Sequence, residues 1–268
     1  MEKFQRNERI AVILKTLLEI PQKVITLRTF ADMFGTAKST TSEDIDLVSK
    51  LMDRLSLGKV ETISGVGGGV RYIPLFEDNK MEDILEALCN ELSSGDRILS
   101  GGFLYMLDII YNPQKLNSIG RIFASKFYSQ NIDYVITVET KGIPLAFMTA
   151  KYLNVPLVIV RHYNEATDGA SVNINYISGS SKKIQTMALS LRALKRNSRL
   201  LFIDDFMKGG GTAKGIIDIS KEFECEVSGI GVLIATKEPV KKMVEEYYSL
   251  FTLENIDDKN KKINLKIK

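Results

Sequence analysis

The sequence predicts an α/β protein in two parts: a small N-terminal unit of three helices and a hairpin, followed by a larger domain with a central, mainly parallel sheet. Three observations predict this architecture. The chain has 268 residues, which is enough for about two domains of roughly 150 residues each. Apolar residues near the N-terminus recur at helical spacing. Farther along, short and nearly continuous apolar runs alternate with helical stretches, as in parallel sheets that are covered on both faces.

The first two helices of the N-terminal unit are indicated by apolar spacing and by stop signals. Apolar residues within Ile10–Leu18 recur about one helical turn apart, and Pro21 follows them. A second short helix is predicted over Thr26–Phe34, because Gly35 directly after it is a common helix stop.

A third helix and a hairpin complete the unit, which spans residues 1–74. This helix is expected to begin near Thr40, which has capping-box spacing to Glu43, and to end before Gly58. Lys59–Ile63 and Val70–Ile73 are predicted as two strands on either side of a glycine-rich tip. Three helices followed by a hairpin form the order of a winged helix-turn-helix module.

The second domain is predicted to span residues 75–268, with the polar junction Pro74–Lys80 at its start. An amphipathic helix is expected at Met81–Leu92. The predicted strands of the sheet are Tyr134–Val138, Leu157–Val160, Leu200–Ile203 and Ile230–Ala235. The predicted helices between them are Ile143–Leu153, Ile184–Arg196 and Thr212–Phe223. The C-terminal residues around Asp257 and Asp258 are expected to form a terminal hairpin or a mobile tail.

The composition excludes several classes of protein. With 44% hydrophobic and 26% charged residues, the chain is globular rather than disordered or collagen-like. It contains no apolar run of the roughly 18 residues that a membrane span needs and no secretory signal, so we expect a cytoplasmic protein without a membrane partner. Cys89 and Cys225 cannot form a disulfide framework or a zinc quartet, and the single histidine, His162, rules out a multi-histidine metal centre. The net charge of +3 neither requires nor excludes a nucleic-acid partner.

The segment around two adjacent aspartates is the most informative motif. The apolar strand Leu200–Ile203 ends at Asp204 and Asp205. Three glycines, Gly209–Gly211, then lead into a helix at Thr212. Ligands of open α/β sheets bind at the carboxyl ends of the strands. Glycine N–H groups, a hydroxyl and a helix N-terminus suit a phosphate monoester, and two carboxylates suit the vicinal hydroxyls of a ribose. The motif therefore predicts a site for a ribose 5-phosphate group. The alternative is a glycine turn beside two solvated acids.

This motif resembles the signature of the type I phosphoribosyltransferases, which bind phosphoribosyl pyrophosphate (PRPP). It departs from the usual pattern at Lys208 and Gly209, where family enzymes carry small or hydroxyl residues, and Lys208 could add a positive charge to the phosphate site. A second segment, Val138–Pro144, stands where those enzymes place their pyrophosphate loop; a plain turn with an exposed lysine is the alternative. The resemblance implies effector contacts from Lys141, Gly142, Asp204, Asp205, Phe206, Met207, Lys208, Gly209, Gly210, Gly211 and Thr212.

The polar segment Tyr163–Ser181 occupies the place of the flexible hood that closes over PRPP in those enzymes. Its small and polar residues suit a lid that orders on ligand binding, and a long hairpin is an equally supported interpretation. His162, which adjoins the segment, is interpreted as structural rather than catalytic.

The whole chain resembles the bacterial purine operon repressor family, in which a winged helix is joined to a phosphoribosyltransferase-like domain. The resemblance includes the glycine-rich wing, the Lys141–Pro144 loop and the Asp204–Lys208 signature. It implies a DNA-binding transcriptional repressor of purine biosynthesis genes that acts as a homodimer on operator double-stranded DNA. It also implies that PRPP, with Mg²⁺, binds as an effector at a non-catalytic site and relieves repression. On this interpretation the chain has no catalytic residues, no protein-bound metal and no catalytic cofactor, and a purine nucleotide that carries a diphosphate could compete for the pocket.

Two other functions are compatible with these residues. One is a catalytically active purine phosphoribosyltransferase with an appended nucleic-acid-binding domain, which Asp204, Asp205 and the glycine loop would support. The other is an RNA- or protein-binding adaptor that uses the same sensor.

The N-terminal unit is only weakly basic, with two more Lys and Arg than Asp and Glu residues. Glu43, Asp44 and Asp46 lie in the first turns of the expected recognition helix, where they would repel phosphates but would stabilise the helix N-terminus through its dipole. The candidate DNA contacts, mostly to phosphates, are Lys3, Arg6, Arg9, Lys38, Ser39, Thr40, Thr41, Gly68 and Arg71. A solvated charge is the alternative for each of them, and a protein-binding winged helix is the alternative for the whole unit.

Overall fold

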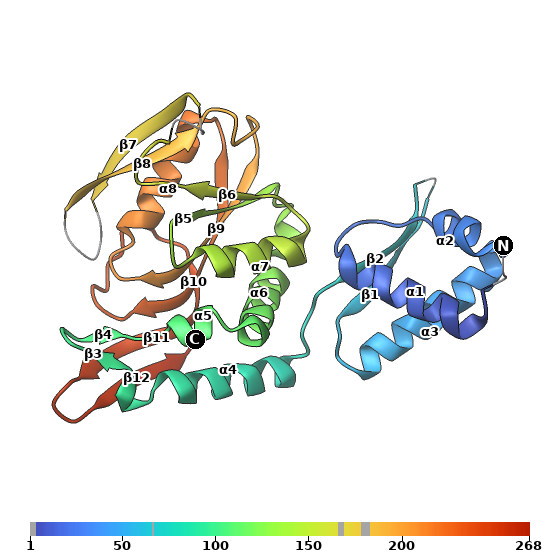
Figure 1. The fold of residues 1–268 in the computed structure, drawn as a ribbon, viewed down its shortest axis with the longest axis horizontal. Helices are drawn as coiled ribbons and strands as arrows, with labels where there is room; N and C mark the ends of the chain where they lie inside the picture. Colours follow the sequence, from blue (N-terminus) through green and yellow to red (C-terminus); the bar gives the residue numbers. More distant parts are fainter. Residues whose placement is uncertain (1–3, 66, 166–168, 178–182) are drawn as a thin grey trace.

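The computed structural model describes residues 4–65, 67–165, 169–177 and 183–268 (Figure 1). Its N-terminal unit has the predicted order of three helices and a hairpin. The elements are α1 (Arg6–Glu19), α2 (Leu27–Phe34), α3 (Lys38–Arg54), β1 (Lys59–Ile63) and β2 (Gly69–Ile73). The two strands are antiparallel. The unit has a hydrophobic core of its own, in which Ile13, Phe30 and Met52 are buried together.

The third helix begins two residues earlier than predicted. Its N-cap is Ala37, whose backbone is extended, and no side chain caps the helix. The capping box expected from Thr40 and Glu43 is therefore wrong, because Thr40 already lies within the first helical turn. The preceding helix ends as predicted at Gly35, which has a left-handed backbone conformation with φ of 61°.

The segment between the N-terminal unit and the sheet is largely helical. It contains α4 (Asp78–Leu92), η1 (Gly95–Arg97), β3 (Ile98–Leu99), β4 (Phe103–Leu104), α5 (Leu107–Ile110), α6 (Pro113–Phe127) and η2 (Tyr128–Gln130). The sequence analysis did not predict α6, although its start carries a recognisable signal. Asn112 caps the helix by accepting from the backbone N–H groups of Gln114 and Lys115, and Pro113 occupies the first turn.

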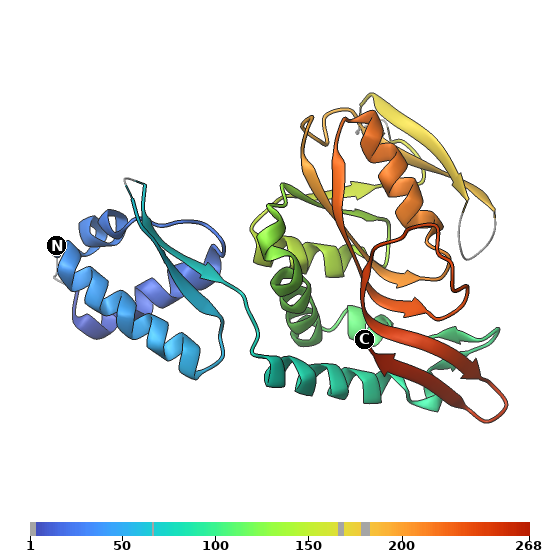
Figure 2. The ribbon, with the colours of Figure 1, turned by 180° about the vertical axis from the view of Figure 1, so that it is seen from behind.

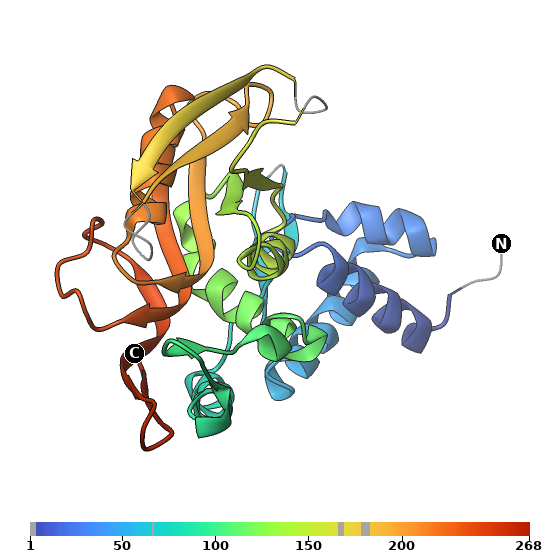
Figure 3. The same cartoon turned by 60° about the vertical axis from the view of Figure 1, so that its left-hand side comes forward.

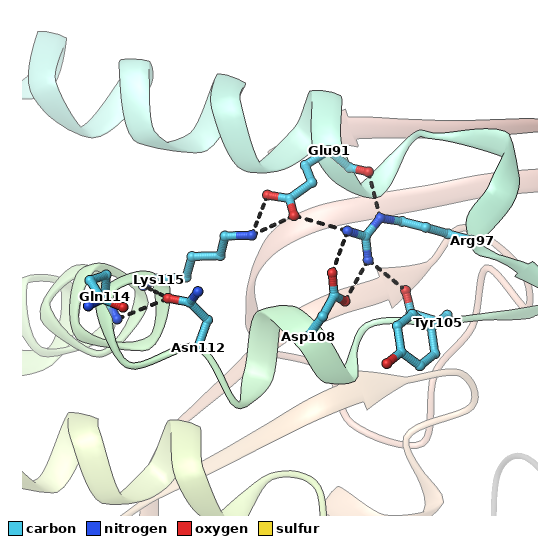
Figure 4. Close-up of polar contacts among 7 residues, drawn as sticks. All are labelled: Glu91, Arg97, Tyr105, Asp108, Asn112, Gln114 and Lys115. Atoms are coloured by element: carbon cyan, nitrogen blue, oxygen red, sulfur yellow. Dashed lines mark hydrogen bonds and ion pairs between the residues drawn. The ribbon is translucent and has the colours of Figure 1, made fainter.

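A polar cluster fixes α4 to the rest of the larger domain (Figure 4). The nearly buried Arg97 donates from Nη2 to Asp108 Oδ2 at 2.7 Å and to Glu91 Oε1 at 3.0 Å. Lys115 of α6 reaches the same Glu91 oxygen at 2.5 Å. The hydrogen bond from Arg97 lowers the pKa of Asp108. Alternating charges thus join α4, α5 and α6 at one point.

The larger domain is built on a six-stranded sheet with the order β12-β11-β10-β9-β5-β6. The strands are β5 (Tyr134–Val138), β6 (Leu157–Val160), β9 (Arg199–Met207), β10 (Glu226–Thr236), β11 (Tyr248–Asp257) and β12 (Lys262–Ile267). All neighbouring strands are parallel except β11 and β12, which form the expected terminal hairpin. The prediction of a central, mainly parallel sheet is confirmed.

Helices cover both faces of this sheet, as the nearly continuous apolar strands predict. In β9, Leu201 and Ile203 belong to the core cluster that includes α6 and α7 (Ile143–Leu153). Leu200 and Phe202 belong to the cluster that includes α8 (Gly211–Glu222). Figures 2 and 3 show α6 and α7 on one side of the strands and α8 on the other.

The predicted helix over Ile184–Arg196 is wrong. Ile184–Ser190 forms strand β8, which pairs antiparallel with β7 (Ser171–Ile177). On its other edge, the N–H and C=O groups of Ala188 bond to the backbone of Arg161 at 2.8 and 3.0 Å. Backbone pairing on both edges favours the strand, and short apolar segments do not distinguish the two structures by spacing alone. Tyr163–Ser181 accordingly contributes to a long hairpin, and residues 166–168 and 178–182 lie outside the described part of the chain.

No helix in the described part of the chain is long and apolar enough to cross a membrane. Cys89 and Cys225 are both free thiols.

Candidate functional site

A cavity of about 380 Å³ lies at the carboxyl ends of β5 and β9. Lys141 lines it, together with every residue of the predicted run Asp204–Thr212. The volume falls within the range of small-molecule sites. The structure therefore gathers most of the predicted effector-binding residues around one pocket, although they come from two separate strand–helix connections.

The two aspartates are adjacent residues near the carboxyl end of β9, and both line the pocket. Asp204 Oδ1 accepts a hydrogen bond from the backbone N–H of Asp205 at 2.9 Å. Burial, followed by the adjacent charge of Asp205, raises the pKa of Asp204 well above its usual value. The pocket thus holds a carboxyl group that is costly to ionise without a ligand, as groups in binding sites often are.

The glycine turn after the aspartates points the N-terminus of α8 toward the pocket. Gly210 adopts the left-handed conformation with φ of 78°, which a residue with a side chain would rarely adopt. The backbone N–H of Met243 donates to Gly209 at 2.9 Å, and Lys242 Nζ donates to the carbonyl of Lys208 at 2.5 Å. The turn is therefore held by two residues outside the pocket lining, while the Lys208 side chain itself is exposed.

Gly142, in the loop between β5 and α7, packs closely against Asp204 of β9. A Cβ atom at this position would lie 2.7 Å from Asp204 Oδ1 and 2.8 Å from Thr137 Oγ1. Gly142 is the N-cap of α7 and is buried beneath the pocket, whereas Lys141 is exposed at its edge. Only glycine allows α7 to begin this close to β9.

The side chains of two predicted effector-binding residues, Met207 and Phe206, pack largely into the hydrophobic core. The side chain of Met207 is 4% exposed and belongs to the core beneath α8, so only its backbone can serve a ligand. Phe206 is half-buried and packs partly against the core on the opposite face. Their apolar side chains alternate between the two faces of β9 because neighbouring residues of a strand point in opposite directions.

The pocket also contains residues that sequence reasoning missed. Tyr176 and Gln185 of the β7–β8 hairpin line it, and the Tyr176 hydroxyl donates to Gln185 Oε1 at 2.7 Å. Burial, followed by the charge of Asp204, raises the pKa of Tyr176. The predicted hood was the signal available for Tyr176, but it does not indicate which of its side chains point inward. Gln185 lay in the wrongly predicted helix over Ile184–Arg196, so no signal indicated its place at the pocket.

Glu139 and His162 lie at the ends of β5 and β6, at the same rim. The backbone N–H of His162 donates to Glu139 Oε1 at 2.7 Å, and its ring nitrogen Nδ1 lies 3.3 Å from the carbonyl oxygen of Thr186. These contacts join two strand ends to β8. The structural interpretation of His162 fits them.

Two of the candidate DNA-contacting residues are buried. Arg9 Nε donates to Asp44 Oδ2 at 2.6 Å, and the two side chains are 10% and 1% exposed. Arg6 reaches the other oxygen of Asp44 at 3.3 Å. Thr41 is completely buried and bonds to Thr36 at 3.2 Å. Arg9 therefore supports the packing of α1 against α3, and Thr41 supports the turn between α2 and α3. These contacts correct the expectation that the two residues face DNA. Asp44 is explained by this ion pair, rather than by the helix dipole alone.

The remaining candidates lie at or near the surface. Lys38 and Ser39 are exposed at the start of α3, and Thr40 is half-buried. Arg71 pairs across the wing with Glu61 at 2.6 Å. At Gly68 a Cβ atom would lie 2.3 Å from the Ile63 carbonyl, so this glycine serves a tight turn rather than a loose tip. Lys3 lies outside the described residues.

In the described part of the chain, no three His, Cys, Asp or Glu side chains are grouped so that they could hold a metal ion.

Comparisons with known proteins match the two parts separately and together. The family model of the bacterial purine repressor N-terminal domain matches residues 5–74, and the phosphoribosyl transferase domain model matches residues 106–267. The chain is 44% identical to the purine biosynthesis transcriptional repressor PurR of Bacillus subtilis, over 98% of this chain and 92% of that protein. It is 35% identical to the purine biosynthesis transcriptional activator PurR of Lactococcus lactis, over 98% of this chain and 97% of that protein.

One solved structure shows the fold of the larger domain. The adenine phosphoribosyltransferase of Thermoanaerobacter pseudethanolicus superposes with a TM-score of 0.54 at 17% identity, covering 63% of this chain and 99% of that one. At this identity the likeness establishes the fold of the sheet and its helices, and nothing about their activity.

Proposed function

The chain belongs to the bacterial purine repressor family, and on that premise we propose that it is a DNA-binding transcriptional repressor of purine biosynthesis genes whose operator binding is relieved by PRPP. One observation carries the proposal: a purine repressor N-terminal domain and a pocket with an acid pair, a glycine turn and a helix N-terminus occur in the same chain. Relatives over nearly the full length are named as a repressor and as an activator of purine biosynthesis. We propose repression because the relative of higher identity, at 44%, is the repressor.

On this proposal, each part of PRPP has a contact in the pocket. Asp204 and Asp205 would accept hydrogen bonds from the ribose hydroxyls. The turn at Gly209–Gly211 and the start of α8 would bind the 5-phosphate, because backbone N–H groups and the helix dipole favour an anion there. Lys141, which is exposed at the pocket edge, would meet the pyrophosphate. Magnesium would arrive with the ligand and take most of its oxygen ligands from it.

We propose that this pocket senses PRPP rather than transferring its ribose. The relatives that match nearly the whole chain are named as transcriptional regulators. An active purine phosphoribosyltransferase is the second candidate, and the acid pair Asp204–Asp205 on a transferase fold favours it. Product formation from PRPP, Mg²⁺ and adenine, guanine or xanthine would support the enzyme and contradict the sensor.

On the DNA side, the exposed start of α3 is the proposed phosphate contact. Lys38 and Ser39 are exposed there, at the positive end of the helix dipole. We further propose a homodimer, because operator readers commonly match the two-fold symmetry of their sites. Sedimentation of the free and DNA-bound protein would test the dimer, and a monomer on a two-fold operator would contradict it.

The central test is a DNA-binding titration on a purine-gene control region, with and without PRPP and Mg²⁺. PRPP is expected to weaken binding by about 5–150-fold, the usual range of allosteric coupling. Absence of specific DNA binding, or an affinity that PRPP leaves unchanged, would refute the proposal. The same titration with PRPP and a purine nucleotide that carries a diphosphate would show whether such nucleotides compete with PRPP.

The variant Lys38→Ala tests the proposed phosphate contact. It is expected to weaken DNA binding and to reduce the slope of log affinity against log salt by about one, because one fewer counterion is released. Its affinity for PRPP should not change. Lys259→Ala, which removes an exposed lysine of the terminal hairpin, is the matched control and should leave the salt slope unchanged.

A further inference from the structure

Arg121 of α6 lies where the larger domain meets the N-terminal unit. It is 8% exposed. Its Nη2 donates to the carbonyl of Ser56 at 3.0 Å and also to that of Leu75, and its Nε donates to Pro74 at 3.4 Å. The guanidinium stacks on the Phe76 ring at 3.9 Å from the centroid. A single side chain of the larger domain therefore holds both the residue that follows α3 and the segment that follows β2.

One of the carbonyls that Arg121 binds, that of Ser56, lies where a cation is favoured. Ser56 follows Leu55, the C-cap of α3, and the C-terminus of a helix carries a partial negative charge. A second cation, Lys80 of α4, donates to the carbonyl of Leu55 at 3.2 Å. Two cations from outside the N-terminal unit thus hold the C-terminal end of the expected recognition helix.

The hydrogen bonds of Arg121 depend on where the N-terminal unit sits relative to α6. Among the described residues, no carboxylate forms an ion pair with Arg121, and burial lowers its pKa. A buried arginine stays charged and needs its hydrogen bonds, so separation from these carbonyls would leave an unsatisfied cation. Small movements at the junction are therefore expected to favour one of two arrangements rather than a continuous range.

The other end of the connection is the effector pocket. Arg121 follows Gly120, where a Cβ atom would lie 2.5 Å from Met148 Cγ of α7. The Tyr152 hydroxyl of α7 donates to Asn117 Oδ1 of α6 at 2.7 Å. The backbone of α6 at Gly120 therefore packs directly against the Met148 side chain of α7. Because α7 begins at Gly142, against Asp204, one helix pair extends from the pocket to Arg121. Figures 1 and 2 show α6 on the side of the larger domain that faces the N-terminal unit.

We propose that Arg121 is a positioning residue through which occupancy of the effector pocket changes the placement of the DNA-binding unit. Ligand at the Lys141–Gly142 loop shifts α7, α7 carries α6 with it, and the guanidinium then favours a different placement of the Ser56, Pro74 and Leu75 carbonyls. The inference rests on the proposed function, since it explains how PRPP and DNA affect each other.

The test measures the coupling between the two ligands in the full-length protein. The affinity for operator DNA is titrated with and without PRPP, and the affinity for PRPP is titrated with and without DNA. Linkage requires the two factors to be equal in every variant. In Arg121→Met, we expect each affinity measured alone to stay within about threefold of the wild type, while the coupling factor falls toward one.

Two further variants keep the test informative if Arg121→Met fails to fold. Arg121→Lys retains the charge but lacks the planar fork, so it should retain only part of the coupling. Tyr152→Phe removes the α7–α6 hydrogen bond without a change of volume and should also reduce the coupling factor. Lys126→Met, on the same helix but over the Tyr248 ring at 5.0 Å, is the matched control and should couple as the wild type does.

The outcomes separate this inference from the proposed function. If PRPP has no effect on DNA binding by the wild type, the proposed function fails. If the wild type responds but the folded Arg121 variants respond equally, the proposed function stands and the role of Arg121 is refuted. Equal loss of coupling in Lys126→Met would also refute it, because the effect would then not depend on the junction.

Discussion

At the scale of single residues, Asp204 is a carboxyl group whose burial at the pocket makes it costly to ionise. Its pKa is raised by burial and then by the charge of Asp205. Ionisation of the Asp204 carboxyl group therefore destabilises the folded, ligand-free protein. A ribose whose hydroxyls donate to the carboxylates would offset that penalty. On the proposed function, the residue would favour binding at the expense of the stability of the free protein, as groups in functional sites commonly do.

The variant Asp204→Asn should separate these two effects. We expect higher stability of the ligand-free protein at neutral pH, and an affinity for PRPP lower by about 1.5–3 kcal/mol, the usual value of a hydrogen bond to a charged group. Thermal unfolding and calorimetric titration measure the two quantities. Lower stability together with unchanged affinity would contradict the assigned role.

The pH dependence of this variant has a defined sign. Since the folded-state pKa of Asp204 is raised, the folded state binds more protons than the unfolded state between the two pKa values. This contribution to the free energy of unfolding is therefore largest at pH values below about 4, near the unfolded pKa. It is lost as the pH rises through the folded-state pKa. The stability gain from Asp204→Asn should accordingly shrink as the pH falls toward 4.

At the scale of elements, α1 and α3 are held together by a buried ion pair rather than by apolar contacts alone. Arg9 and Asp44 are each almost fully buried, and Arg6 adds an exposed contact to the same carboxylate. Such a pair contributes little relative to an apolar replacement, but removal of one partner leaves the other as a buried charge. The crossing of the expected recognition helix over α1 thus depends on both charges.

The variant Asp44→Ala should destabilise the N-terminal unit by about 3–5 kcal/mol, because Arg9 would remain buried without its partner. Urea unfolding followed by circular dichroism measures this loss. Asp46→Ala, an exposed acid on the same helix, should change stability by less than about 0.5 kcal/mol. A similar small effect for both variants would show that Asp44 is a surface charge in solution.

At the scale of the whole molecule, the N-terminal unit and the larger domain have separate cores. The core of the small unit contains residues of α1 to β2 only, whereas the sheet contributes to two other clusters. In the described part of the chain, the side-chain hydrogen bonds at the junction come from Arg121 and Lys80. Each part is therefore expected to unfold largely as its own cooperative unit.

Differential scanning calorimetry with each ligand tests this division. PRPP at about 100 times its dissociation constant should stabilise the larger domain by about 2.7 kcal/mol, and operator DNA should stabilise mainly the smaller unit. Two transitions that respond to different ligands are expected. One transition that shifts equally with both ligands would show that the parts unfold together.

Local signals were sufficient for much of the architecture. Gly35 ends its helix, the apolar runs form the sheet, and Asp204–Thr212 lies at the pocket, because a glycine stop, a run of buried residues and a strand-to-helix turn each depend on a few neighbouring residues. The residues of the motif also come together where the carboxyl ends of parallel strands meet.

The remaining features depended on partners far away in the chain. Ile184–Ser190 became a strand through pairing with β7, which its own spacing does not reveal. Nothing in the neighbouring sequence distinguishes Arg9 from an exposed arginine, because its burial depends on the ion pair with Asp44 of another helix. Arg121 carries no local signal, since its role arises from carbonyls of another unit. The sequence by itself determined most of the elements and the acid and glycine residues of the pocket. Tertiary structure alone decided the pairing of β8, which charges are buried and which contacts join the two parts, because burial and pairing are set by residues distant in sequence.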